Sequence, residues 1–235
     1  MTQHEVEVQR AYYASTAQRY DEMHVREGDE HYFALSFMLS MLDFLEIRSV
    51  LDVGAGTGRT VQHIRAHRPD IRVVGIEPVQ ALIDQGHAKG LSADELRVGD
   101  ATALPYADGE FDLVCEFAVL HHVREPRRVV AEMLRVARRA VFISDTNRFG
   151  QGSAAVRAAK QLLSAVGLWK AADLVRTRGK GYTLSEGDGL AYSYSVFDDY
   201  RQVREGCRRI HLLNTVDGGV NPYRTAPHVA LLGIK

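Results

Sequence analysis

The sequence is poor in cysteine, carries almost no net charge and has no long apolar run. Its two cysteines, Cys115 and Cys207, are too few for a disulfide framework, and Cys115 lies in an apolar run, as a buried free thiol does in a reducing compartment. The net charge of −1 over 235 residues provides no basic surface for nucleic acid or an anionic membrane. No apolar run approaches the roughly 18 residues that span a bilayer, and the polar first residues, MTQHEVEVQR, are no signal peptide. We therefore expect a cytoplasmic protein that binds neither nucleic acid nor membrane.

Strand-like apolar runs alternate with helical patterns through the middle of the chain. This alternation predicts an α/β fold with a parallel sheet that helices cover on both faces. The expected strands are residues 49–53, 71–77, 95–100, 111–117 and 140–145. The expected helices are residues 57–66, 78–88, with Pro78 at the first helical position, and 125–139.

The last third of the chain has a different character. Two helical patches, 154–166 and 170–177, precede a connector that contains glycine, lysine and arginine. Three closely spaced tyrosines follow. The chain then has a helical pattern at residues 198–207 and two expected terminal strands at residues 208–215 and 228–235.

Three glycines spaced by two, Gly54, Gly56 and Gly58, follow the first apolar strand in the sequence VLDVGAGTGRT. Asp52 lies at the tip of that strand, and a helical pattern begins at Thr57. Glycine has no Cβ and adopts conformations that other residues avoid, so the backbone at such a turn can approach a ligand closely.

Two further acids lie at the tips of the next two expected strands. Glu77 comes near the offset of about 20 residues at which an acid hydrogen-bonds ribose hydroxyls in nucleotide-binding turns. Asp100, with Ala101 beside it, is placed to accept from an exocyclic amine such as that of adenine. Because an open parallel sheet binds ligands at the carboxyl ends of its strands, the glycine turn and the two acids should share one crevice.

These segments resemble the class I S-adenosylmethionine-dependent methyltransferases, in their small-molecule, type 11-like branch. The resemblance covers roughly residues 12–145. It rests on DVGAGTG, GIEP, GDATALPYADGEFDLV and VLHHV, and on YYASTAQRYDEM, which is similar to the segment that folds over the cofactor in that family.

The resemblance implies a doubly wound, mostly parallel sheet of seven strands whose last strand runs antiparallel. Within a single domain we expect an N-terminal roof of helices at 1–45 and a cofactor-binding core at 46–146. A helical lid at 147–205 would follow the fifth strand, and terminal strands would occupy 206–235.

The resemblance also implies S-adenosylmethionine as the cofactor and a set of residues that bind it. Its methionine part would contact the glycine turn, and its amino group would lie over Asp52, through water. Tyr20 would close the pocket from above. The residues expected to bind the methionine part are Gly54, Ala55 and Gly56. Those expected to bind the ribose and adenine are Glu77, Pro78, Asp100 and Ala101. Glu116 and Phe117 would lie beside the sulfonium.

The expected reaction is transfer of a methyl group to a small-molecule acceptor, with oxygen favoured because a histidine and acids lie at the active edge. Histidine titrates near neutral pH, so His121 is the first candidate for a general base, and Asp145 is the second. The alternative interpretation is that His121 and its neighbour only cap or pack the following helix.

Four residues are expected to contact the acceptor: His122, Asn147, Tyr192 and Tyr194. An Asx turn at Asn147 and ordinary core packing of the tyrosines are the alternatives. No group of histidines, cysteines and carboxylates has the spacing of a metal site, so we expect no metal.

Three alternative functions fit parts of the same pattern. N- or C-methylation of a small metabolite would use the same cofactor. A non-catalytic S-adenosylmethionine-binding protein would keep the binding residues. An NAD-dependent oxidoreductase is disfavoured, because its fingerprint has two residues before the last glycine, whereas Gly56 and Gly58 are separated by one.

Overall fold

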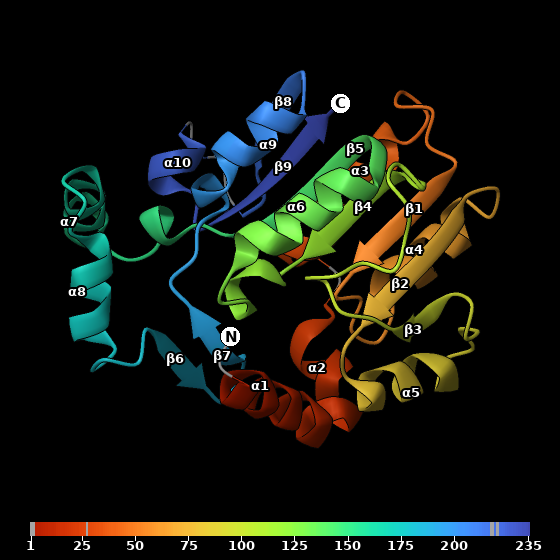
Figure 1. Ribbon diagram of the computed structural model, residues 1–235, viewed down its shortest axis with the longest axis horizontal. Helices are drawn as coiled ribbons and strands as arrows, with labels where there is room; N and C mark the ends of the chain where they lie inside the picture. The colour runs from red at the N-terminus through yellow and green to blue at the C-terminus, as the bar shows by residue number, and fades with distance from the viewer. Residues whose placement is uncertain (1–2, 27, 217–218, 220) are drawn as a thin grey trace.

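The computed structural model describes residues 3–26, 28–216, 219 and 221–235, and its centre is a seven-stranded sheet (Figure 1). The strand order is β3-β2-β1-β4-β5-β9-β8. Strand β9 is antiparallel to both of its neighbours, and the other pairs are parallel. This confirms the predicted doubly wound sheet. The strands are β1 (Ser49–Val53), β2 (Arg72–Glu77), β3 (Leu96–Val98), β4 (Phe111–Phe117), β5 (Ala137–Thr146), β8 (Arg209–Asn214) and β9 (His228–Ile234).

Helices cover both faces of the sheet because its central strands are apolar on both sides. One core cluster joins the sheet to helices α3 (Glu30–Met41), α4 (Arg59–His67) and α5 (Gln80–Ala88). A second cluster lies on the opposite face and contains residues of α6 (Pro126–Val136) and α9 (Tyr200–Gly206). Helix α6 buries Val129, Val130, Met133 and Val136.

Several predicted helix boundaries differ from the structure, and two of the differences have a visible cause. Helix α5 begins at Gln80, so Pro78 precedes the helix and does not occupy its first position. The Glu77 carboxylate accepts from the N–H of Val79 there, which holds the chain extended before the helix starts. Helix α6 ends at Val136, because Ala137 pairs with Phe111 and residues 137–139 extend strand β5.

The N-terminal segment lies over the carboxyl ends of the strands. It comprises α1 (Gln3–Thr16), the 3₁₀ helix η1 (Ala17–Arg19) and α2 (Tyr20–His24). Figure 1 shows α1 and α2 below the sheet, with the end of β7 beside α1. Among the described residues, no helix combines the length and the apolar character that crossing a membrane requires.

The segment between β5 and β8 contains the two predicted helices and a hairpin that the sequence did not reveal. Neither α7 (Ala154–Ala165) nor α8 (Trp169–Arg176) buries a residue, and Figure 1 shows both standing apart from the sheet. The hairpin of β6 (Tyr182–Ser185) and β7 (Gly189–Tyr192) packs against α1 instead. There the Tyr12 hydroxyl donates to the Glu186 carbonyl over 2.7 Å. The remaining short helices are η2 (Leu120–His122), η3 (Arg148–Gly150), η4 (Val196–Asp198) and α10 (Pro222–Thr225).

Candidate functional site

A cavity of about 680 Å³ lies where the carboxyl ends of the parallel strands meet the N-terminal helices. This volume is within the range of small-molecule and cofactor sites. One part of its lining comes from the ends of β1, β2 and β3, and the other from the segment after β4 and the turn of the β6–β7 hairpin. Of the predicted site residues, those that line it are Tyr20, Gly54, Glu77, Pro78, Asp100, Ala101, Phe117, His121 and His122.

The glycine turn after β1 is held against β2 and leaves no room for side chains. The N–H groups of Gly54 and Ala55 both donate to the Ile76 carbonyl over 2.9 Å. Gly54 and Gly56 have φ values of +72° and +57°, which glycine adopts without strain. A Cβ on Gly54 would lie 2.4 Å from Val119 Cγ2, and one on Gly56 would lie 2.7 Å from the Tyr20 hydroxyl oxygen. Tyr20 therefore covers the turn directly.

Glu77 is buried at the end of β2 and bonds to the backbone of two loops. Its Oε2 accepts from the N–H of Gly56 and its Oε1 from the N–H of Val79, each over 3.0 Å. Burial raises the pKa of the Glu77 carboxyl to about 7, although the hydrogen bonds and Arg10 oppose the rise. Burial likewise raises the pKa of Asp52 to about 6. Asp52 lies behind the turn, outside the residues that line the cavity.

Asp100 marks the rim of the cavity after β3. Its Oδ1 accepts from the N–H and the hydroxyl of Thr102, over 2.8 and 2.7 Å. The side chain is exposed, so its other oxygen is open to a ligand.

At the end of β4, Phe117 and Glu116 occupy different places. Phe117 lines the cavity. Glu116 is completely buried and accepts from the N–H groups of Val119 and Ser144, each over 2.9 Å. Burial and the charge of Asp145 raise its pKa well above the ordinary value. Glu116 thus holds the turn after β4 in place through buried hydrogen bonds, whereas Phe117 contributes to the cavity wall.

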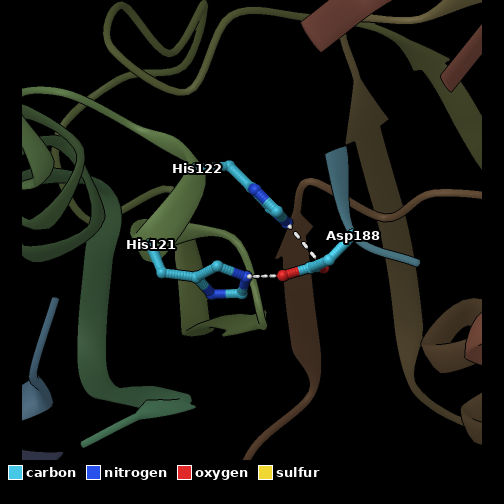
Figure 2. Close-up of side chains that lie close together, drawn as sticks. All are labelled: His121, His122 and Asp188. Carbon is cyan, nitrogen blue, oxygen red and sulfur yellow. Dashed lines mark ion pairs between the residues drawn. The ribbon is translucent and has the colours of Figure 1, made fainter. Parts of the chain in front are cut away.

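His121 lies between the carboxylates of Asp145 and Asp188, and Figure 2 shows its contact with Asp188. Its Nδ1 is 2.7 Å from Asp145 Oδ1, and its Nε2 is 3.4 Å from Asp188 Oδ2. Burial lowers the pKa of the His121 imidazole, but the negative charges of Asp145 and Asp188 and the hydrogen bond to Asp145 outweigh it and raise the pKa to about 10. The pKa of Asp145 is lowered to about 2, because His121 opposes the effect of burial. At neutral pH this arrangement holds His121 as an imidazolium.

His122 lies beside His121 and contacts the other oxygen of the same carboxylate (Figure 2). Its Nε2 lies 3.4 Å from Asp188 Oδ1 and 2.9 Å from the Tyr13 hydroxyl. Its Nδ1 lies 2.7 Å from the Leu190 carbonyl, which makes Nδ1 the protonated nitrogen of a neutral ring. Burial and the charge of His121 lower the pKa of His122, so neutrality is favoured.

Three residues predicted to contact the acceptor lie outside the main cavity. Asn147 is fully buried and donates to the carbonyls of Pro222, Tyr223 and Ala226. The hydroxyl of Tyr194, also buried, donates to Asp199 over 3.0 Å. Tyr192 and Tyr194 border a separate hollow of about 230 Å³, which His121 also lines.

Asp188, which lines the cavity beside His121 and His122, is a residue that the sequence interpretation missed. It lies in the turn that joins β6 to β7, within the sequence EGDGL. An Asp-Gly pair between two short apolar runs is a signal for a hairpin turn and could have located the loop. It could not have shown that this loop returns to the end of β4.

Comparison with known proteins identifies the cofactor-binding part of the chain. Residues 51–143 match the family described as "Methyltransferase domain". Ajmaline N-methyltransferase of Rauvolfia serpentina is 42% identical over 95 residues, which are 38% of this chain and 32% of that protein. Demethylmenaquinone methyltransferase of Renibacterium salmoninarum is 39% identical over 89 residues, 38% of this chain and 36% of that protein. The matches thus span about a third of the length of these relatives.

The fold has solved counterparts over the whole chain. Magnesium protoporphyrin IX methyltransferase (ChlM) from Synechocystis PCC 6803, solved with bound SAH, has a TM-score of 0.60 at 13% identity. The alignment covers 98% of this chain and 99% of that one, and at this identity the likeness is one of fold. Together these findings show that residues 51–143 match a methyltransferase domain and that the whole chain has a methyltransferase-like fold.

Proposed function

We propose that this chain transfers the methyl group of S-adenosylmethionine to an oxygen atom of a small-molecule acceptor. The observation that carries the proposal is the two-part lining of the main cavity. The glycine turn, Glu77 and Asp100 form one part, and Phe117 and His121 lie in the other. A donor and an acceptor would therefore meet in one enclosed space.

The residues of the first part fit the cofactor. Gly54 lines the cavity with its backbone, and the absence of a Cβ at Gly54 and Gly56 lets Val119 and Tyr20 pack directly on the turn. Glu77 and Asp100 offer carboxylate oxygens, which suit the ribose hydroxyls and the adenine amine. Asp52, with a pKa of about 6, is ionised at neutral pH and provides negative charge below an ammonium group. When bound, the cofactor supplies an electrophilic methyl group.

The contribution of the chain to the reaction would be alignment and exclusion of water. Tyr20 covers the glycine turn, and the hairpin turn at Asp188 closes the cavity near His121. Holding two reactants in line contributes up to roughly 7–11 kcal/mol to lowering a barrier. Phe117 would present an apolar wall to the reacting atoms, where exclusion of water strengthens electrostatic interactions.

An oxygen acceptor must also lose its proton, and His121 is the residue predicted to accept it. In the observed arrangement both of its nitrogens face carboxylates. Before His121 could act as a base, Asp188 would have to release Nε2 and the proton on Nε2 would have to leave, for example to Asp188 as it moves away; the exposure of 46% for the Asp188 side chain allows such a movement. Asp145 would remain in place and orient the ring.

A nitrogen acceptor is the second candidate, and one observation favours it. Because His121 is held as an imidazolium, the site as observed suits an acceptor that reaches it already deprotonated. Two of the similar proteins are named N-methyltransferases.

The experiment is a methyl-transfer assay with isotopically labelled S-adenosylmethionine and panels of phenolic, hydroxyl and amine acceptors. Binding of S-adenosylhomocysteine and NAD is compared first, by thermal shift. We expect S-adenosylhomocysteine to stabilise the protein, NAD to leave it unchanged, and Glu77→Ala to abolish the shift while the exposed control Glu205→Ala keeps it. Failure of the wild-type protein to bind S-adenosylhomocysteine would overturn the proposal. Binding without transfer to any acceptor would favour a non-catalytic binding protein.

A further inference from the structure

Three side chains with metal-binding atoms converge at the acceptor end of the main cavity: His121, His122 and Asp188 (Figure 2). One ligand atom from each lies within 4.8 Å of the other two. We propose that these residues bind a divalent transition-metal ion, of which zinc is the best match, with a remaining coordination position open to the cavity. The binding itself does not depend on the proposed methyl transfer, and while the ion is bound His121 Nε2 is a ligand and does not act as a base.

The distances to Asp188 fit an ion between the side chains better than direct hydrogen bonds. Each histidine Nε2 lies 3.4 Å from an oxygen of Asp188. Charge-assisted hydrogen bonds between such groups are about 2.7–2.9 Å long, and the His121–Asp145 contact, at 2.7 Å, has that length. Two ligands bound tetrahedrally to zinc at 2.0–2.1 Å lie about 3.4 Å apart. Each of the two histidine contacts, which go to different oxygens of Asp188, has the length of one edge of such a tetrahedron.

Both histidines are oriented through their other nitrogen, as metal-binding histidines are. Nδ1 of His121 contacts the carboxylate of Asp145, and Nδ1 of His122 contacts the carbonyl of Leu190, each at 2.7 Å. These contacts direct both Nε2 atoms toward Asp188. A carboxylate behind one ligand and a backbone carbonyl behind the other are the usual outer partners of zinc-bound imidazoles.

His121 Nε2 is a buried polar atom without a hydrogen-bond partner in the described part of the chain. Only 6% of the His121 side chain is exposed. Leaving a buried polar atom unsatisfied costs free energy, and a bound ion would remove that cost. The atom points toward Asp188, as Figure 2 shows.

The donor set selects the class of ion. Two imidazole nitrogens and one carboxylate suit zinc and its neighbours in the first transition row, whereas magnesium and calcium prefer oxygen ligands. Two carboxylates, Asp145 and Asp188, supply negative charge to balance a dication. Three protein ligands leave the fourth position of a tetrahedron for a molecule in the cavity.

One neighbour competes with the ion. The Tyr13 hydroxyl lies 2.9 Å from His122 Nε2 and occupies the lone pair that a metal would use. Burial raises the pKa of Tyr13 well above its ordinary value, so the hydroxyl stays protonated and must move away when the ion binds. Tyr13→Phe removes this competitor and should bind the ion at least as tightly as the wild type.

The test is isothermal titration calorimetry of tag-free, chelator-treated protein with zinc chloride, and with magnesium chloride for comparison. We expect one zinc per chain and no heat from magnesium. His121→Ala, His122→Ala and Asp188→Asn should each weaken zinc binding at least about tenfold, and Asp145→Asn should weaken it by roughly 10–100-fold through its effect on a ligand. Circular dichroism verifies that each variant is folded.

A second histidine pair provides the matched control. His63 and His67 stack on α4 with ring centroids 4.3 Å apart, away from the cavity. His67→Ala should leave the zinc affinity unchanged. Absence of zinc binding by the wild type, or binding lost in His67→Ala but kept in Asp188→Asn, would overturn the proposal. Binding of S-adenosylhomocysteine, measured on the same samples, tests the proposed function separately.

Discussion

The buried carboxylate of Glu77 accepts a hydrogen bond from the backbone N–H of Gly56, 3.0 Å away. The bond joins the tip of β2 to the glycine turn that follows β1. A residue expected to bind the cofactor therefore also fixes the loop that receives it. Because the bond is buried, its strength depends on the protonation state of Glu77.

We expect affinity for S-adenosylhomocysteine to rise as the pH increases toward 7 and to level off above it. The pKa of Glu77 is about 7, and ribose hydroxyls donate to the ionised carboxylate. Below pH 7 the affinity should fall by up to about tenfold per pH unit. Calorimetric titrations between pH 5.5 and 8.5 measure this, and Glu77→Gln should bind weakly with no step near pH 7. A wild-type affinity independent of pH would contradict the assignment.

The free energy of unfolding of the ligand-free protein should decrease as the pH rises, whereas the affinity for S-adenosylhomocysteine should increase. Burial raises the pKa of Glu77 from its ordinary value of 4.5, so the folded state binds the proton more tightly than the unfolded state. Stability contributed by Glu77 therefore decreases as the pH rises from about 4.5 to about 7. Urea unfolding across this range should show a smaller decrease for Glu77→Gln than for the wild type.

Gly58→Ala should destabilise the protein more than Gly90→Ala. The two glycines have nearly the same φ, +87° and +88°, so alanine at either costs about 1–2 kcal/mol of backbone strain. A Cβ on Gly58 would also lie 2.2 Å from Cδ1 of the buried Leu91, whereas one on Gly90 would meet nothing within 4 Å. We expect a further loss of about 1–3 kcal/mol for Gly58→Ala in urea unfolding. Equal losses of stability in the two variants would show that the Leu91 side chain moves aside at little cost.

Asn147→Ala should lower the stability of the protein and leave the binding of the acceptor unchanged. Its amide donates to three carbonyls of the segment around α10, and its oxygen accepts from Ser195 and Phe149. Leaving such groups unsatisfied should cost about 2–3 kcal/mol. The exposed cap Asn221, replaced by alanine, should cost about 1 kcal/mol. An Asn147→Ala variant of normal stability that has a raised KM for the acceptor would restore the predicted binding role.

Gly189→Ala should loosen the hairpin without affecting the sheet. Gly189 has a φ of +66°, and a Cβ there would lie 2.6 Å from the Tyr12 ring and 2.8 Å from Gln9. We expect faster amide hydrogen exchange across residues 182–192 and unchanged exchange in β4 and β5. Gly187→Ala, where a Cβ meets nothing within 4 Å, is the control. Unchanged exchange in Gly189→Ala would mean that α1 adjusts to the added atom.

The strands of the core could be predicted because each is a short apolar run with a turn signal after it. The helix ends could not, since they depend on partners elsewhere in the chain. Ala137 leaves the helical pattern because Phe111 pairs with it. The β6–β7 hairpin was missed for the same reason: its Leu190 N–H bonds to the side chain of Gln9, far away in the sequence.

The candidate site likewise has a part that could be predicted from the sequence and a part that depends on contacts between distant segments. The common location of Glu77, Asp100 and His121 at one cavity could be predicted, because parallel strands bring their carboxyl ends to one edge of the sheet. Asp188 joins them only through the hairpin's packing on α1, which no local pattern encodes. Asn147 was misplaced because a polar residue just after β5 fits an acceptor contact and a buried loop anchor equally well.

Strand β9 lies between β5 and β8 in the sheet, and this strand order constrains how the sheet forms during folding. All of its residues are buried, and β8 reaches the sheet only through it. Strand β8 precedes β9 in the chain, so it must wait for β9 or dock together with it as a hairpin. A proline introduced near Leu231 would therefore detach two strands at once. It would also leave the edge of β5 open to pairing with other molecules, and aggregation would be the expected result.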